Sequence, residues 1–317
     1  MNVLNLLTKL YAKLHNYPLV PYWVLTPFRK MVRNTANRVL PSYLAKRKEE
    51  RIVHQAGVII SFTSFPARIN DVWQVVESLK NQSYRPEKII LWLSKDQFPA
   101  KDTIPVSLWQ EEDSLFEIRM VEGDIRSHKK FFYVMQKFPK KAFMTCDDDI
   151  YYHPDTLKHL VECSRLYPNC VVANVTRSIG YGENGEILPY NQWKSETPAY
   201  GSENLIQIGA GGVLYPPGTL HEMTLRKDLF FSLTPMADDI WLNCMARLKG
   251  TPVVQSGMRF LPLPIKSDSP KLSSTNKGKS MNDAQIRKLR EYLIDNQLQD
   301  VYGADCQIKA MGGVKYQ

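Results

Sequence analysis

Strand-like runs alternate with helix-like segments through the first half of this chain, and this alternation limits the folds that it can adopt. The strand-like runs cover 57–63, 88–94, 116–121 and 142–146, and helical patterns cover 70–82, 129–138 and 154–166. Strands that alternate with helices favour a parallel sheet covered on both faces. The sequence therefore predicts an α/β fold with a mostly parallel sheet. Ligands in such sheets bind outside the carboxyl ends of the strands.

Three consecutive aspartates, Asp147, Asp148 and Asp149, follow the fourth strand-like run. Aspartate is disfavoured in strands and adjacent like charges repel, so these residues have no structural use inside a strand. Mg²⁺ and Mn²⁺ take oxygen ligands, commonly one or two carboxylates together with the phosphates of a substrate. Two aspartates at i and i+2 at the end of a strand therefore predict a shared cation site. The alternative is an acidic turn in which Asp149 or Asp155 caps the next helix.

A second acidic pair, Asp238 and Asp239, opens another predicted helix. Capping would explain one acid as the N-cap and the other as a first-turn residue that the helix dipole favours. A carboxylate held at a helix start also stays ionised, as a general base must, so the pair predicts a catalytic role. Shortly before it, the glycine-rich stretch 208–218 predicts a backbone that a ligand or another strand approaches closely.

The positive charge of the chain is concentrated at its amino terminus. Of the net charge of +9, residues 1–51 contribute +8, from ten basic and two acidic side chains. A helical pattern at the start places an apolar arc on one side, made of Val3, Leu4, Leu6, Leu7, Leu10, Tyr11 and Leu14.

The segment that follows, 17–28, is too short and too rich in proline to span a bilayer, but its aromatic residues suit a headgroup boundary. The arm 1–51 therefore predicts peripheral binding to an anionic membrane surface. The alternative is a helix that packs its apolar stripe on the domain or on a partner subunit.

Composition argues against several other classes of function. The five cysteines show no metal-ligand spacing and the six histidines do not cluster, so zinc is not expected. The cysteines fit reduced core residues in a cytosolic setting. No nucleic-acid motif accompanies the basic arm, so no nucleic-acid partner is expected.

The aspartates at 147–149 after a hydrophobic strand resemble the D-x-D motif of GT-A glycosyltransferases. The segment 60–69 is similar to the opening strand and loop of a bacterial group with that fold, which is found in lipopolysaccharide and capsule assembly. Further stretches fit the same group in the same order: 89–94, 129–130, 211–218 and 237–241. The resemblance spans roughly residues 56 to 260 and leaves out the arm and the tail after Leu261.

On the donor side, this resemblance implies roles for individual residues. Binding of the nucleotide sugar would fall to Thr63, Ser64, Phe65, Pro66, Arg68, Lys130, Asp147 and Asp148. Asp147 would face the ribose or the metal, and Asp149 would bind the Mn²⁺ or Mg²⁺ that bridges the diphosphate. A cation there offsets charge on the leaving nucleoside diphosphate.

On the acceptor side, the resemblance implies that Asp239 sits where inverting relatives keep the base that deprotonates the acceptor hydroxyl. Those relatives usually have a Glu-Asp pair, whereas this chain has Asp238 and Asp239. It therefore stays open which of the two acids would act as the base and whether the reaction would invert or retain the anomeric configuration. Gly211, Gly212 and Trp241 would shape the acceptor side.

Three parts are expected: the membrane-associating arm (1–51), a GT-A catalytic domain (52–265), and a mobile loop with a C-terminal helix (266–317). The catalytic domain would have a nucleotide half (56–150) and an acceptor half (151–265).

The expected function is metal-dependent transfer of a sugar from a nucleotide-sugar donor to a lipid-linked or growing surface glycan. A UDP-sugar is the first expectation for the donor. The enzyme would be cytoplasmic and peripheral at the inner face of a bacterial cell membrane. Alternatives are a sugar-nucleotide hydrolase or nucleotidyltransferase with the same carboxylates, and a binding protein with a structural cation.

Overall fold

A seven-stranded sheet runs through the centre of the protein in the computed structural model, which describes residues 2–15, 20–46, 54–196, 204–258, 261–266, 281–303 and 306. Its strand order is β13-β8-β12-β6-β2-β4-β5. In chain order the strands are β2 (Val58–Thr63), β4 (Lys88–Ser94), β5 (Phe116–Val121), β6 (Ala142–Thr145), β8 (Val171–Ala173), β12 (Val213–Tyr215) and β13 (Val253–Gln255). Only β12 runs against its neighbours, so the sheet is mostly parallel, as predicted.

The first four strands, β2, β4, β5 and β6, are all parallel and lie side by side in the order β6-β2-β4-β5, as in half of a Rossmann-like sheet. Strands β2, β4 and β6 are largely apolar, as strands buried on both faces require. At the edge of the sheet, β5 carries Glu117 and Arg119 and is only partly buried between its two ends. Along β2, Val58, Ile60 and Phe62 enter one core cluster and Ile59 enters the other, so successive side chains fill opposite faces of the sheet.

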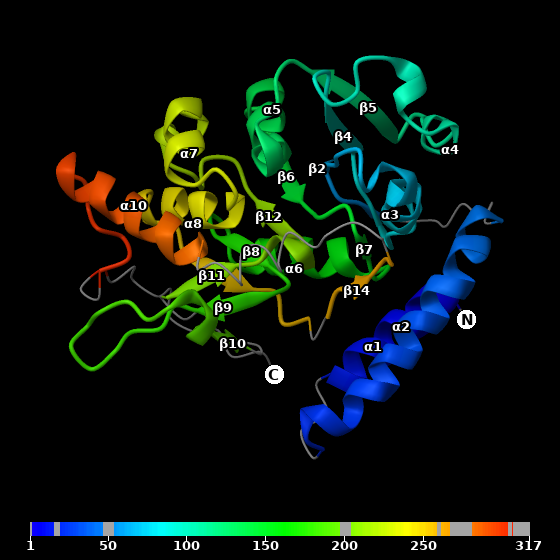
Figure 1. Ribbon diagram of the computed structural model, residues 1–317, viewed down its shortest axis with the longest axis horizontal. Helices are drawn as coiled ribbons and strands as arrows, with labels where there is room; N and C mark the ends of the chain where they lie inside the picture. Colours follow the sequence, from blue (N-terminus) through cyan, green and yellow to red (C-terminus); the bar gives the residue numbers. More distant parts are fainter. Residues whose placement is uncertain are drawn as a thin grey trace.

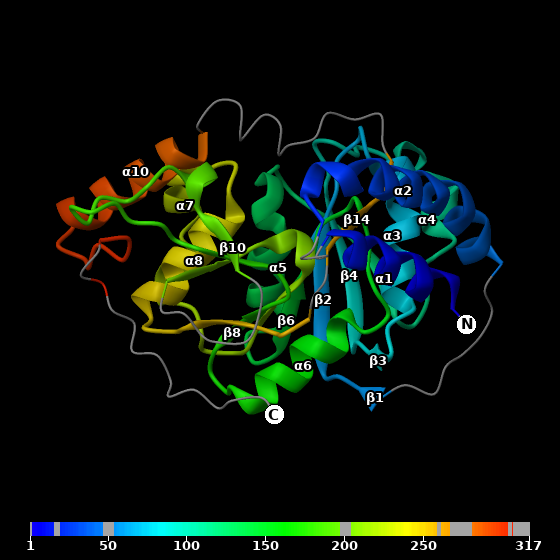
Figure 2. The same ribbon diagram turned by 90° about the horizontal axis from the view of Figure 1, so that it is seen from below.

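Helices cover both faces of this sheet (Figures 1 and 2). They are α3 (Val72–Lys80), α5 (Lys129–Lys137), α6 (Thr156–Leu166) and α8 (Asp238–Leu248), with shorter α4 (Val106–Trp109) and α7 (Lys227–Leu233). Each forms where apolar residues recur at helical spacing; in α3 the side chains of Val72, Val75, Val76 and Leu79 are fully buried. The helix predicted at 70–82 corresponds to α3, which begins at Val72 after a 3₁₀ turn at Ile69–Asp71 and ends at Lys80.

Smaller elements complete the fold. They include β1 (His54–Gln55) with β3 (Tyr84–Arg85), β7 (Ile150–Tyr151) with β14 (Leu263–Pro264), and a small sheet of β9 (Thr176–Ser178), β10 (Lys194–Glu196) and β11 (Leu205–Gln207). The sequence did not predict β9, β10 and β11, because each is only three residues long. The five cysteines, all among the described residues, are buried and form no disulfide bond with one another.

Two helices at the amino terminus, α1 (Val3–His15) and α2 (Tyr22–Ala45), lie side by side at the edge of the domain (Figure 1). The segment 17–28, expected to be too rich in proline to span a bilayer, is helical from Tyr22 onward, and α2 continues through Pro27. Packing of its apolar stripe, with Leu40 fully buried, compensates for the backbone hydrogen bond that proline removes.

The last described helix is α10 (Met281–Asp295), within the part 266–317 where a C-terminal helix was expected, and it lies at the opposite end of the molecule from α1 and α2 (Figure 1). The expected mobile loop lies outside the described residues except for Lys266. Among the helices that the structure describes, none is long and apolar enough to cross a membrane.

Candidate active site

Four segments distant in sequence meet beyond the carboxyl end of β6. Lys130, at the start of α5, forms an ion pair with Asp147, which directly follows Cys146 and the strand. The Lys130 ammonium also lies 3.7 Å from a carboxylate oxygen of Asp238 at the start of α8. The fourth segment is the glycine-rich stretch, whose Gly209 bonds to Asp239. The fold thus brings the two predicted acidic groups to one place.

Lys130 is the central cation of this cluster. Burial disfavours its charge, but the carboxylates of Asp147, Asp238 and Asp239 outweigh burial and raise the pKa of Lys130 well above its usual value. The carbonyl oxygen of Lys130 accepts a hydrogen bond from Ser61 in β2, at 2.5 Å, which ties α5 to the central strand. Lys130 therefore stays charged and holds the acidic residues together.

The Asp239 carboxylate is bound by backbone. The N–H group of Gly209 donates to both of its oxygens, at 3.1 and 3.0 Å. Loss of solvation and the charge of Asp238 raise the pKa of Asp239 to about 8, against the opposing effects of Lys130 and the Gly209 N–H. The expectation that this carboxylate stays ionised at a helix start is therefore wrong near neutral pH, because burial outweighs the groups that favour its charge. Its ionised form, which appears as pH rises toward 8, is a stronger base than an ordinary carboxylate and can accept a proton.

A second cluster forms around Arg68, in the loop after β2. Its guanidinium lies 2.7 Å from Asp148 and 3.1 Å from Asp149, and the Ser64 hydroxyl donates to the other oxygen of Asp148 at 2.6 Å. Asp148 is only 7% exposed, so its carboxylate joins two loops in the interior. Asp148 therefore has a clear structural function, whereas the resemblance implied contact with the nucleotide sugar.

Asp147 and Asp149 remain as a pair of acids that flank the buried Asp148. Desolvation and the charge of Asp147 raise the pKa of Asp149, while Arg68 opposes this shift. Within the described residues no group of three or more His, Cys, Asp or Glu side chains forms a metal-binding arrangement. Two carboxylates still fit a Mg²⁺ or Mn²⁺ ion that takes its other ligands from substrate phosphates and water.

The predicted nucleotide-binding loop after β2 is divided between interior and surface. Thr63 is buried and donates to the carbonyl oxygen of Trp92 at 2.7 Å, which commits its hydroxyl to the sheet. Phe65 is half-buried beneath the guanidinium of Arg68, 5.3 Å from the ring centre, and Pro66 is exposed. Phe65 and Pro66 are thus the members of this loop that present surface to a ligand.

The predicted acceptor-side residues lie in the core. Trp241 is fully buried, with its indole N–H donating to the carbonyl oxygen of Thr224 at 3.0 Å. A Cβ at Gly211 would lie 2.6 Å from Val175, and one at Gly212, where φ is +84°, would lie 2.5 Å from Met144. These residues permit close packing behind the site, so they can shape an acceptor surface only indirectly.

Sequence reasoning missed two residues that touch the site. Gly209 is the glycine of its stretch that faces the carboxylates: a Cβ there would lie 3.0 Å from Asp239 and 3.6 Å from Asp147. Tyr152 is buried, and its hydroxyl accepts the N–H of Asp147 at 2.7 Å. The glycine run was a usable signal for Gly209, whereas no pattern distinguished Tyr152 from other core aromatics.

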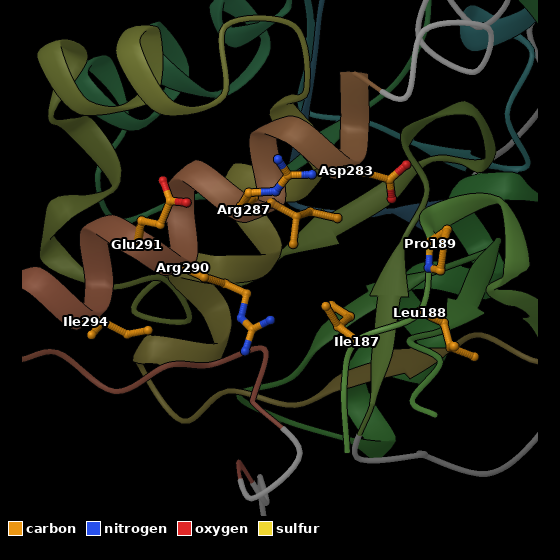
Figure 3. A pocket seen from close by; sticks show the side chains of 9 residues that line it. Ile187, Leu188, Pro189, Asp283, Arg287, Arg290, Glu291 and Ile294 are labelled. Atoms are coloured by element: carbon orange, nitrogen blue, oxygen red, sulfur yellow. The ribbon is translucent and has the colours of Figure 1, made fainter. Parts of the chain in front are cut away.

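A pocket of about 470 Å³ lies between α10 and the segment 187–189 (Figure 3). It is lined by Ile187, Leu188, Pro189, Asp283, Ile286, Arg287, Arg290, Glu291 and Ile294. The Asp283 carboxylate accepts the N–H of Tyr190 at 2.7 Å, and the charge of Asp239, after burial, contributes to raising the pKa of Tyr190 to about 12. Tyr190 therefore bonds to a residue that lines the pocket and lies within the electrostatic influence of Asp239.

Comparisons with known proteins do not assign a family. No family model matches the sequence, and a comparison with curated proteins finds no match. Three solved structures share features of the fold at low similarity. HddC from Yersinia pseudotuberculosis is 15% identical with a TM-score of 0.32, over 50% of this chain and 76% of that one.

The second is 4-diphosphocytidyl-2C-methyl-D-erythritolsynthase from Anaerococcus prevotii DSM 20548, at 13% identity and a TM-score of 0.35, over 74% of this chain and 97% of that one. The third is a UDP-glucose pyrophosphorylase complexed with UDP-glucose, at 11% identity and a TM-score of 0.37, over 77% and 100%. At these TM-scores the similarity carries no information about function, which must be inferred from the site itself.

Proposed function

We propose that this protein is a metal-dependent glycosyltransferase that moves a sugar from a nucleotide sugar to a hydroxyl group of a glycan or lipid-linked acceptor. One observation carries the proposal: two acidic pairs, Asp147 with Asp149 and Asp238 with Asp239, converge around Lys130 beyond the carboxyl ends of parallel strands. Transfer from a nucleoside diphosphate needs both a cation site and a base, and these two pairs are chemically suited to those two tasks.

In this proposal, Asp147 and Asp149 would hold Mn²⁺ or Mg²⁺. A bound divalent cation would offset the negative charge that develops on the diphosphate leaving group. Arg68, 3.1 Å from Asp149, supports the carboxylate from the protein side. Phe65 and Pro66 offer apolar surface to the nucleoside.

Asp239 is the proposed base. The acceptor hydroxyl oxygen forms a bond to the anomeric carbon, the bond from that carbon to the diphosphate oxygen breaks, and the hydroxyl proton passes to Asp239. We favour Asp239 over Asp238 because Asp238 lies near Lys130, whereas the raised pKa of Asp239 makes it the stronger base. Direct attack of this kind inverts the anomeric centre.

The proposed setting is the inner face of a bacterial membrane, where a lipid-linked acceptor would be found. The exposed faces of α1 and α2 support it, because large apolar side chains there, with Trp23 75% and Met31 60% exposed, lie among basic ones. Leu4 and Leu7 are buried against the domain, so α1 uses one face for packing and presents Leu6 and Leu10 on the other. Exposed apolar and basic residues together favour an anionic lipid surface.

The first test is thermal unfolding with a panel of nucleotides and nucleotide sugars, each with and without Mn²⁺. Binding at 100 times the dissociation constant stabilises a protein by about 2.7 kcal/mol, which is measurable. A shift that requires both Mn²⁺ and one nucleotide is expected. No shift with any pair would favour a binding protein with a structural cation.

Turnover then separates the enzymatic alternatives. Release of nucleoside diphosphate only when an acceptor is present is the result expected for a glycosyltransferase. Release without an acceptor would indicate a sugar-nucleotide hydrolase, and formation of pyrophosphate from a nucleoside triphosphate and a sugar phosphate would indicate a nucleotidyltransferase.

A further inference from the structure

Asn37, in α2, bonds to a segment more than two hundred residues away in the sequence. Its amide Nδ2 donates to the carbonyl oxygen of Pro264 at 3.0 Å, and its Oδ1 accepts the N–H of Lys266 at 2.6 Å. The second Nδ2 hydrogen is directed to the carbonyl oxygen of Arg33 at 2.9 Å. Both donor hydrogens and the acceptor oxygen of this side chain are therefore engaged.

These contacts imitate a β-strand partner. A side-chain amide presents a donor and an acceptor as a peptide group does, and the Pro264 carbonyl and Lys266 N–H belong to alternate residues on one edge of the chain. Asn37 thus occupies one edge of β14.

The opposite edge of β14 holds the acidic segment. The N–H of Ile265 donates to the carbonyl oxygen of Asp149 at 2.8 Å. Pro264 pairs with Ile150 and Leu263 with Tyr151, directly after the aspartates. β14 is therefore sandwiched between Asn37 and the backbone of Asp149.

We propose that Asn37 is a positioning residue that sets the place of Asp149 through β14. A two-residue strand paired on one side has little stability of its own. The side-chain bonds from α2 supply the second edge, so that the carboxylate of Asp149 is presented from a fixed backbone. A second contact joins the amino-terminal helices to the same segment: the Asn5 side chain lies 2.7 Å from His153 Nε2.

The part of this inference that concerns cation binding rests on the proposed function, whereas the part that concerns Asp149 backbone order does not. Two measurements on the full-length chain separate them. The first is hydrogen exchange resolved to the Ile265 amide, which reports the bond to Asp149. The second is a Mn²⁺ titration followed by electron paramagnetic resonance, which reports the cation site alone.

Asn37→Ala removes all three bonds, and Asn37→Asp keeps an acceptor for the Lys266 N–H but loses both donors. The matched control is Asn34→Ala, because Asn34 is exposed on the same helix. Faster exchange at Ile265, by about tenfold for Asn37→Ala and less for Asn37→Asp, is expected from the loss of these hydrogen bonds. The dissociation constant for Mn²⁺ should rise in the same order, while Asn34→Ala stays at the wild-type values.

Ile265 exchange in Asn37→Ala equal to that of Asn34→Ala would overturn the proposal. Faster exchange with unchanged Mn²⁺ affinity would also overturn it, since β14 would then move without displacing the Asp149 carboxylate. If the wild-type protein binds no Mn²⁺, the proposed cation site fails, and Ile265 exchange alone still decides whether Asn37 orders the Asp149 backbone.

Discussion

The N–H group of Gly209 donates to both oxygens of the Asp239 carboxylate, at 3.1 and 3.0 Å. The two residues are thirty positions apart, and this contact orients a carboxylate whose pKa burial and the charge of Asp238 raise to about 8. A main-chain donor fixes the carboxylate without neutralising its charge. Asp239 is therefore oriented and basic at the same time, which suits a proton acceptor.

Replacement of the proposed base should separate binding from chemistry. Asp239→Asn keeps an oxygen that can accept the Gly209 N–H but cannot take a proton, so the rate of transfer should fall by about 10² to 10⁴. The thermal shift with nucleotide and Mn²⁺ should remain. Asp228→Asn, at an exposed carboxylate paired with Arg226, is the matched control. Wild-type turnover in Asp239→Asn would assign the base to another residue.

Removal of the proposed cation ligand should abolish metal-dependent binding. Asp149→Ala takes away one of two carboxylates and leaves Arg68 bound to Asp148, so the fold should persist while the Mn²⁺-dependent thermal shift disappears. The exposed Asp102 provides the control substitution Asp102→Ala. An unchanged nucleotide affinity in the presence of Mn²⁺ would contradict this role for Asp149.

The acidic pair in α8 should make stability depend on pH. Because the folded-state pKa of Asp239 is raised from 3.8 to about 8, its contribution to stability is present in full below the lower value and is lost as pH rises through the higher one. Across this pH interval, the free energy of unfolding measured with urea should fall as pH rises. It should fall less steeply in Asp239→Asn than in the wild type. Equal slopes in the two proteins would show that Asp239 titrates normally in the folded state.

Vesicle binding tests the exposed face of α1 and α2. The double substitution Leu10→Gln with Trp23→Ser should weaken binding to phosphatidylglycerol vesicles at least tenfold, since each inserted side chain contributes on the order of 1.5 kcal/mol or more. The double substitution Lys9→Gln with Lys13→Gln removes two positive charges and should also weaken vesicle binding, by about 1 kcal/mol for each lysine. Flotation on a density gradient measures both.

The control for vesicle binding is Leu166→Gln, at an apolar side chain that is 57% exposed on α6. It should bind vesicles as the wild type does. Undiminished flotation of the Leu10 and Trp23 variant would remove the membrane from the proposal. A change in oligomeric state in that variant would instead assign this face to contact between copies of the chain.

The central sheet and the positions of the candidate acids could be predicted from the sequence. Strands buried on both faces are largely apolar, so 88–94 was predicted at its observed bounds. The segment 116–121 was also predicted at its observed bounds, although Glu117 and Arg119 leave this edge strand only partly buried. Parallel strands also bring their carboxyl ends to one edge, so polar residues after β2 and β6 were expected at a common site. Both inferences depend on local composition, which the sequence displays directly.

Tertiary structure alone decided what each side chain touches. Helical periodicity identified the apolar arc of α1, but the neighbours that bury Leu4 and Leu7 while exposing Leu6 and Leu10 come from distant segments. The same holds for Trp241, a predicted acceptor residue that the core encloses.

The partners of the polar side chains of Asp148 and Asn37 likewise depend on the tertiary structure. Three identical aspartates gave no sign that the middle one turns inward to Arg68 and Ser64. The contact of Asn37 with Pro264 spans 227 positions. A sequence pattern records how one segment is built, whereas hydrogen bonds and burial between segments depend on how the folded chain brings them together.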